Sequence, residues 1–169
     1  MRSVDQQILD YIEEALNPIT IGNGYNTHVK KVFVGKLIQP ERFSEYERES
    51  LIQVRWSSKE NARAGDRAGQ VHMESNSNFM IVASMTNVTH EVFTGFLTDI
   101  EASLAKTPNM DLYSGAFKVM DSFVNDVTIT STTESDELED TYSKDIREQV
   151  AELTFNVQYI YIADQLSGN

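Results

Sequence analysis

The chain has 169 residues, with 40% hydrophobic and 24% charged residues, which predicts one domain with its own core and argues against global disorder. Its formal net charge of −12 predicts that the molecule as a whole repels nucleic acid, although nine of the 14 basic residues lie between Lys30 and Arg67. The absence of cysteine excludes disulfides and thiolate metal sites. Because we find neither a signal-peptide pattern nor an apolar run near the ~20 residues that span a bilayer, we expect a soluble chain made in the cytoplasm.

The first predicted element is an amphipathic helix over Ser3–Leu16, in which apolar residues recur at every fourth position. Ser3 and Gln6 have capping-box spacing, and Asp5 suits the positive end of the helix dipole. The Gly-Asn-Gly turn that begins at Gly22 follows this helix. It lacks both the strand before and the Gly-Lys-Ser/Thr helix start after a phosphate-binding loop, so it predicts a turn and no nucleotide site.

Alternating apolar and polar residues predict three strands in the next part of the chain, at His28–Val34, Leu51–Trp56 and Gln70–Val88. A polar connection over Gly35–Ser50 separates the first two strands. Ser57–Gly69 is basic-leaning and rich in small residues, which predicts a mobile loop. The lone tryptophan, Trp56, ends one apolar strand face and is interpreted as a core anchor, with a subunit contact as the alternative.

A second helix is expected to start at its N-cap, Thr89, and to end before Pro108. Six apolar side chains of this helix are expected to face the sheet. They are Val92, Phe93, Phe96, Leu97, Ile100 and Leu104. Further alternation predicts two more strands, at Phe123–Thr133 and Ile146–Ile162. At ~3.3 Å per residue the last strand would span roughly 50 Å, which is longer than the core of this domain needs, so it is expected to pair or pack with another molecule.

This order of elements predicts an α+β fold in a single domain, residues 1–169. We expect a mainly antiparallel β-sheet with two helices packed on one face and a long hairpin before the C-terminal strand. None of the three histidines has metal-ligand spacing. His72 and Glu74 are interpreted as a surface pair. The chain has no nucleophile-elbow, dinucleotide-binding or kinase pattern. We therefore expect no enzymatic activity, no cofactor and no metal.

Glu134–Asp145 contains six carboxylates and one lysine, but neither glycine nor the spacing of a calcium-binding loop, so it predicts a solvated acidic hairpin loop. In a ring of copies, such loops would repel the phosphate backbone of DNA passing through.

The chain also resembles the tail terminator and minor tail proteins of long-tailed bacteriophages over nearly its full length. The resemblance rests on the first helix leading into I-T-I-G-N-G-Y-N-T-H-V-K-K-V-F-V-G, with its Gly24-Tyr25 pair, and on the strand-strand-helix order that contains H-E-V-F-T-G-F-L-T-D-I-E-A-S-L-A. It is completed by the acidic hairpin before A-E-L-T-F-N-V-Q-Y.

The resemblance implies a ring, typically a hexamer, that caps the tail tube, ends its polymerisation and docks to the head connector or stopper protein, while DNA passes through without specific binding. Sheet edges and the N-terminal helix would form the subunit contacts. The carboxylates expected at the lumen or adjoining ring are Glu134, Asp136, Glu137, Glu139, Asp140 and Asp145. The basic residues expected to contact a neighbouring ring are Lys59, Arg63 and Arg67. The residues expected at the subunit interface are Trp56, Tyr159, Ile160, Tyr161 and Ile162.

Other functions stay open on sequence grounds. A head-tail joining or tail completion protein would belong to the same neck region of the virion. A small acidic protein-binding module, such as a regulatory or immunity protein, and an acidic enzyme of an unrecognised type are more distant alternatives.

Overall fold

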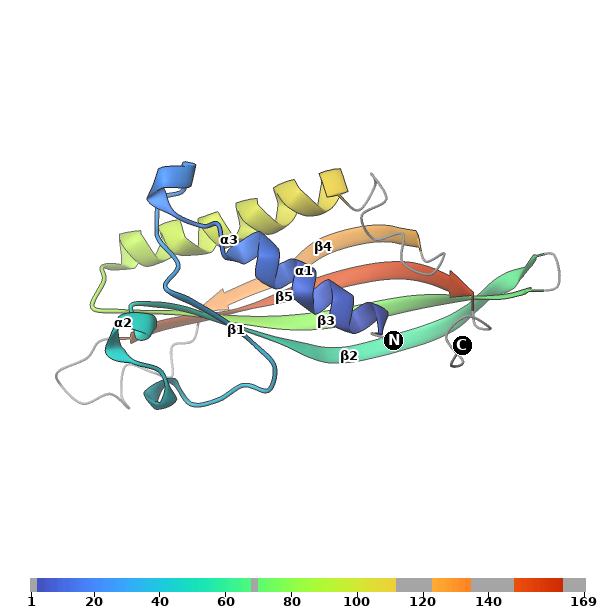
Figure 1. Ribbon diagram of the computed structural model, residues 1–169, viewed down its shortest axis with the longest axis horizontal. Helices are drawn as coiled ribbons and strands as arrows, with labels where there is room; N and C mark the ends of the chain where they lie inside the picture. Colours follow the sequence, from blue (N-terminus) through green and yellow to red (C-terminus); the bar gives the residue numbers. More distant parts are fainter. Residues whose placement is uncertain (1–2, 68–69, 112–122, 135–147, 163–169) are drawn as a thin grey trace.

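The computed structural model describes residues 3–67, 70–111, 123–134 and 148–162 (Figure 1). Its helices and strands, in chain order, are α1 (Val4–Leu16), β1 (Lys31–Val34), α2 (Glu45–Arg48), β2 (Ser50–Arg67), β3 (Gln70–Thr86), α3 (His90–Asp111), β4 (Phe123–Glu134) and β5 (Glu148–Ile162). Two 3-10 turns, η1 (Ile21–Asn23) and η2 (Pro40–Arg42), lie in the connections. This content confirms the predicted α+β class, with a mixed sheet of five strands.

The strands are ordered β1-β2-β3-β5-β4 across the sheet. β1 runs parallel to β2, with Lys31 opposite Leu51 and Val34 opposite Val54. The pairs β2–β3, β3–β5 and β4–β5 are antiparallel. β5 follows β3 along almost its whole length, from Glu148 to Ile162, so the last strand of the chain lies inside the sheet and not at its edge.

The prediction that Ser57–Gly69 is a mobile loop is wrong, because β2 continues to Arg67 and stays paired with β3. Two irregularities interrupt this pairing, between Trp56 and Ser58 and between Arg63 and Gly65. Gly65 has a φ of 138°, which suits glycine at the second irregularity. This part of β2 has polar and small residues on both faces, so its sequence shows no alternation of apolar and polar residues and has the pattern of a loop.

One hydrophobic cluster joins α1 and α3 to β2, β3 and β5. The strand residues in it alternate along each strand and lie in matching rows, such as Val54, Ile81 and Leu153. Of the predicted apolar stripe of α3, all but Val92 are buried, whereas Val92 is 42% exposed. The backbone N–H of Val92 donates to Thr89 Oγ1 at 3.4 Å, as expected for an N-cap.

The start of α1 also follows the prediction. Ser3 Oγ accepts a hydrogen bond from the Gln6 backbone N–H at 3.1 Å. The Gln6 side chain does not close the capping box, because it donates to Asp10 Oδ1. A complete capping box occurs instead at α2, between Ser44 and Glu47, within the segment expected to be a polar connection.

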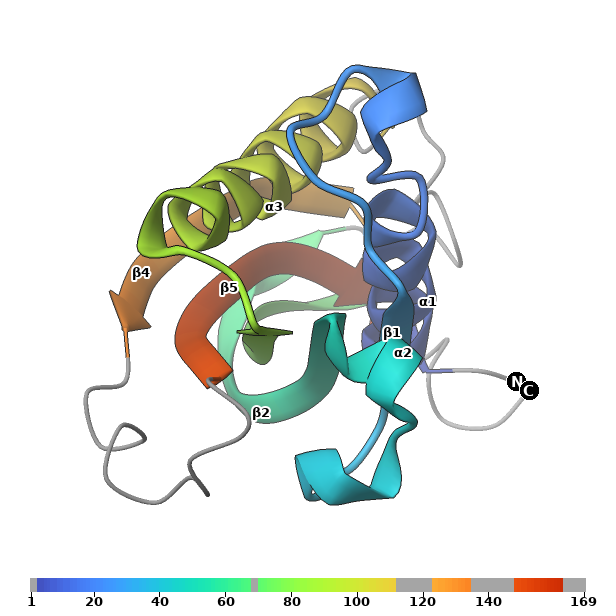
Figure 2. The same cartoon turned by 90° about the vertical axis from the view of Figure 1, so that its left-hand side faces the viewer.

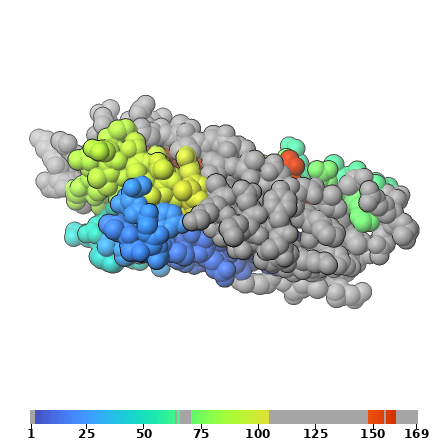
Figure 3. Space-filling view, turned by 90° about the horizontal axis from the view of Figure 1, so that it is seen from above, coloured from blue at the N-terminus to red at the C-terminus, as the bar shows by residue number. Residues whose placement is uncertain are grey.

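The molecule is elongated along its strands (Figure 1). Seen along this direction, the strands twist around one another, and α3 and α1 lie beside them (Figure 2). The described part of the β2–β3 pair extends toward one end of the molecule, away from η1 and the start of α3 (Figure 3). We call the paired residues beyond the row of Trp56 and Phe79 the sheet extension, which comprises Ser58–Arg67 of β2 and Gln70–Asn78 of β3.

Candidate functional site at the base of the sheet extension

A polar cluster replaces the apolar core where the sheet extension begins. Along the face of β3 that meets the helices, the buried residues change from Ala83, Ile81 and Phe79 to Ser77 and Ser75. On β2, the irregularity after Trp56 inserts one residue, so that Lys59 pairs with Ser77 and faces the helices as Trp56 does. The first turn of α1 covers this point and supplies a carboxylate.

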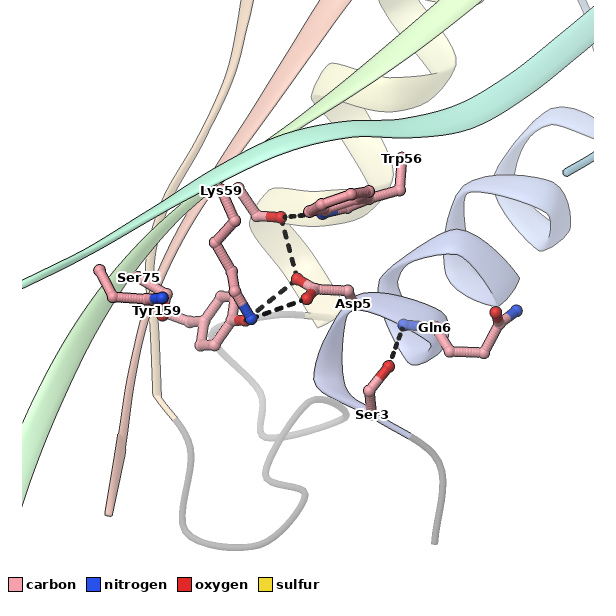
Figure 4. Close-up of polar contacts among 9 residues, drawn as sticks. Ser3, Asp5, Gln6, Trp56, Lys59, Ser75 and Tyr159 are labelled. Carbon is pink, nitrogen blue, oxygen red and sulfur yellow. Dashed lines mark hydrogen bonds and ion pairs between the residues drawn. The ribbon is translucent and has the colours of Figure 1, made fainter. Parts of the chain in front are cut away.

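Asp5 is the centre of this group, which we call the Asp5 cluster: Asp5, Trp56, Lys59, Ser77 and Tyr159 (Figure 4). Asp5 Oδ2 accepts from Lys59 Nζ at 3.0 Å. Asp5 Oδ1 accepts from Ser77 Oγ at 2.9 Å and from Tyr159 Oη at 3.0 Å. Lys59 Nζ also lies 3.4 Å from Tyr159 Oη. One helix and three strands are thereby joined by a single carboxylate.

The electrostatics of the cluster favour protonated Lys59 and Tyr159. Burial opposes the charge on Lys59, but its hydrogen bond to Asp5 and the nearby negative charge outweigh this, and the pKa of Lys59 is raised. Burial, followed by the charge of Asp5, raises the pKa of Tyr159 to about 12. At neutral pH Tyr159 is therefore a neutral donor, so the phenol stabilises the cluster and is not suited to act as a base.

Trp56 is not the core anchor that its strand pattern indicated, because it is 44% exposed. Its indole Nε1 donates to Ser77 Oγ at 3.1 Å, which fixes the ring against the Asp5 cluster and satisfies its polar atom. The irregularity after Trp56 lies at the border of the core, and the next side chain on that face is a lysine. Trp56 thus presents apolar area at the surface in a fixed orientation, as an interface anchor requires.

The structure brings together three of the sequence-predicted site residues: Trp56, Lys59 and Tyr159. Tyr159 is buried, at 1% exposure, and its hydroxyl belongs to the Asp5 cluster. Lys59 directs its ammonium inward to Asp5 and does not offer it freely to a neighbouring ring. The ring-contact role of Lys59, Arg63 and Arg67 stays a prediction, but these residues lie on a strand and not in a loop.

The remaining predicted residues lie apart from the cluster or outside the described part of the chain. The backbone of Ile160, Tyr161 and Ile162 pairs with β3 from Glu74 to His72, at the far end of β5. Glu134 is the last residue of β4. The other five acidic hairpin residues, Asp136, Glu137, Glu139, Asp140 and Asp145, lie outside the described residues.

Sequence reasoning missed a second buried carboxylate, Asp99 of α3, which is 3% exposed. Its Oδ1 accepts from the backbone N–H and Nδ2 of Asn26, at 3.0 and 2.9 Å. Its Oδ2 accepts from the backbone N–H and Oγ1 of Thr27, at 2.8 and 2.5 Å. These four bonds fasten the connection after η1 to α3, so Asp99 has a structural role.

On the opposite face of the sheet from Phe79 and Ser77, asparagines bond across three strands. Asn156 Nδ2 donates to Asn78 Oδ1 at 2.7 Å and also to Asn76 Oδ1. Asn78 Nδ2 donates to Ser58 Oγ at 3.2 Å. The sheet extension is therefore held by side-chain hydrogen bonds on both faces.

Within the described residues, no group of three or more histidine, aspartate or glutamate side chains could hold a metal ion. No helix in that same part of the chain is long and apolar enough to cross a membrane. No protein-family model matches the chain, and no curated protein matches its sequence.

Proposed function

We propose that this chain is a structural subunit of a long-tailed bacteriophage virion. Copies form a ring, hexameric as the resemblance implies, that caps the tail tube, ends its polymerisation and docks to the head connector. The observation that carries the proposal is the outer edge of β2. β1 pairs with β2 only from Leu51 to Val54, and among the described strands none pairs with that edge from Arg55 to Arg67. We call this segment the open edge.

An unpaired strand edge offers a row of backbone N–H and C=O groups that another chain can extend. The half-exposed ring of Trp56 lies at the start of the open edge. Because its N–H is already satisfied by Ser77, covering the ring on assembly costs no lost hydrogen bond at the indole. This combination favours an assembly role, in which the edge and the tryptophan meet a neighbouring subunit.

The proposal includes the layered arrangement expected from the order of elements in the sequence, a mainly antiparallel sheet with two helices on one face. Its support is that three of the four strand pairs are antiparallel and that α1 and α3 share one core cluster. DNA passes through the ring without specific binding, a role that suits the net charge of −12. The tail tube protein and the head connector are the neighbouring partners.

Tube capping can be measured directly. The purified chain is added to polymerising tail tube protein of the same phage, and tube lengths and ends are recorded by negative-stain electron microscopy. We expect rings at one end of each tube and a stop to growth, with Trp56→Ala weakening capping and the exposed α3 variant Glu91→Ala leaving it intact. Unchanged tube lengths and bare ends would refute the tail terminator role. Binding to the capsid connector without any effect on tubes would favour the head-tail joining alternative.

A further inference from the structure

We infer that the open edge of β2 in one copy pairs in antiparallel orientation with β4 of the next copy, in a head-to-tail arrangement. The inference rests on the proposed function, since it names how identical subunits of the ring join. The occupant of the open edge is therefore a second copy of this chain.

Two long strand edges among the described residues are available for such a joint, and the outer edge of β1 has only four residues. β4 has twelve residues and pairs with β5 on one side, while its other side has no partner among the described strands. The open edge of β2 lies at the opposite margin of the same sheet. Joining the two edges extends one sheet from copy to copy and covers both of them when the ring closes.

The strand directions are compatible with this joint. β2 and β5 run one way and β3 and β4 run the other, as the three antiparallel pairs require. Copies related by rotation about an axis along the strands keep these directions. Each open edge then meets a β4 of opposite direction, and the new pair is antiparallel like its neighbours.

The charges of the two edges are also complementary. Residues 55–67 contain four basic residues (Arg55, Lys59, Arg63 and Arg67) and two acidic ones (Glu60 and Asp66), a net charge of +2. β4 contains Asp126 and Glu134 and no basic residue, a net charge of −2. Even with Asp5 counted against Lys59, the β2 side keeps +1. A two-fold dimer would bring like edges and like charges together, whereas head-to-tail pairing brings opposite charges together.

The irregularities of β2 define where the joint can form. Between them, Ser58–Arg63 pairs with β3 without interruption. Irregular pairing on either side hinders strands of other proteins from adding along the full edge. The ammonium of Lys59 is held by Asp5 on the helix side of the sheet, so it does not block the backbone groups of the open edge. The joint therefore centres on Ser58–Arg63, beside Trp56.

Because the chain contains no cysteine, introduced pairs of cysteines can test the joint. Glu60→Cys lies on the open edge and Thr128→Cys lies on β4. Concentrated protein carrying both changes is treated with a short bis-maleimide and separated on a denaturing gel. A second pair in the same antiparallel register, Ala62→Cys with Asp126→Cys, guards against a misfolded variant. Thr98→Cys on the exposed side of α3, combined with Glu60→Cys, is the matched control.

We expect the double edge variants to give a ladder of cross-linked species. A mixture of the Glu60→Cys and Thr128→Cys single variants should stop at dimers, each single variant alone should give none, and the Thr98→Cys control should stay monomeric. Dimers from one single variant alone would indicate like-edge pairing and overturn the inference. The absence of any edge cross-link in both folded double variants, or equal cross-linking of the control, would overturn it as well.

The outcome separates the inference from the proposed function. Rings that cap tubes but show no cross-link between β2 and β4 would refute this joint and leave the tail role in place. A ladder from protein that neither binds nor stops tail tubes would support the joint and refute the tail role.

Discussion

Replacing Asp5 by alanine should destabilise the fold far more than the loss of one surface charge. The change removes the carboxylate that accepts hydrogen bonds from the Lys59 ammonium and from the hydroxyls of Tyr159 and Ser77. Tyr159 and Ser77 are 1% and 0% exposed, so water cannot readily replace Asp5. Each buried hydroxyl that loses its acceptor costs about 1–3 kcal/mol, and we expect a total loss of about 2–4 kcal/mol.

The assay is urea unfolding followed by the fluorescence of Trp56, the single tryptophan, which bonds directly to the Asp5 cluster. Asp5→Asn keeps an acceptor oxygen and loses the charge, so it should fall between wild type and Asp5→Ala. Glu14→Ala removes an exposed carboxylate from the same helix and should change stability by less than about 0.5 kcal/mol. If Asp5→Ala is as stable as Glu14→Ala, the cluster does not hold α1 to the sheet and the reasoning fails.

Three further predictions follow from the same contacts. In the folded state the pKa of Tyr159 is raised to about 12 from 10.0, and that of Lys59 is also raised. The stability that these two groups contribute is therefore complete below pH 10 and is lost as pH rises further. Urea unfolding between pH 10 and 12 should show this decline, and Tyr159→Phe should flatten it. Asp99→Ala should cost about 2–4 kcal/mol in the same assay and speed amide hydrogen exchange at Asn26 and Thr27, whereas Glu91→Ala on the exposed start of α3 should do neither. Trp56→Ala should lower the free energy of unfolding, measured by circular dichroism, by only about 2 kcal/mol, because the ring is half-exposed. It should nevertheless reduce assembly measured by light scattering. A decrease of about 3–5 kcal/mol in the free energy of unfolding would instead mark a core residue.

The elements that could be predicted from sequence are those with local, periodic signals. α1 begins at its Ser3 cap and α3 buries its apolar stripe, because helix caps and helical periodicity depend on residues three or four positions apart. β5 follows two-residue alternation and was found within two residues of its start. The buried part of the apolar stripe does not include Val92, which lies in the first turn of α3 and is exposed.

The candidate site could be predicted only in part, because its contacts are distant in sequence. Asp5 bonds to residues 54, 72 and 154 positions away, at Lys59, Ser77 and Tyr159. Local reasoning could assign Asp5 only to the helix dipole, and it placed Trp56 in the core by counting every second residue. Trp56 keeps that count, since it pairs with Phe79, but it lies at the border of the core and is 44% exposed. The irregularity after it places Lys59 next on that face, and no local pattern of small and polar residues reveals this.

The Asp5 cluster also explains how a polar sheet extension can hold a defined edge. Side chains such as Lys59, Ser77 and Ser75 provide little apolar burial, so strands lined by them gain little order from the hydrophobic effect. Tying them to the first turn of α1 through a buried carboxylate supplies that order through hydrogen bonds instead. An edge that is ordered before assembly loses less conformational entropy when a second copy pairs with it. Weakening the cluster should therefore weaken association of copies as well as folding, even though Asp5 itself lies on the helix side of the sheet and not at its edge.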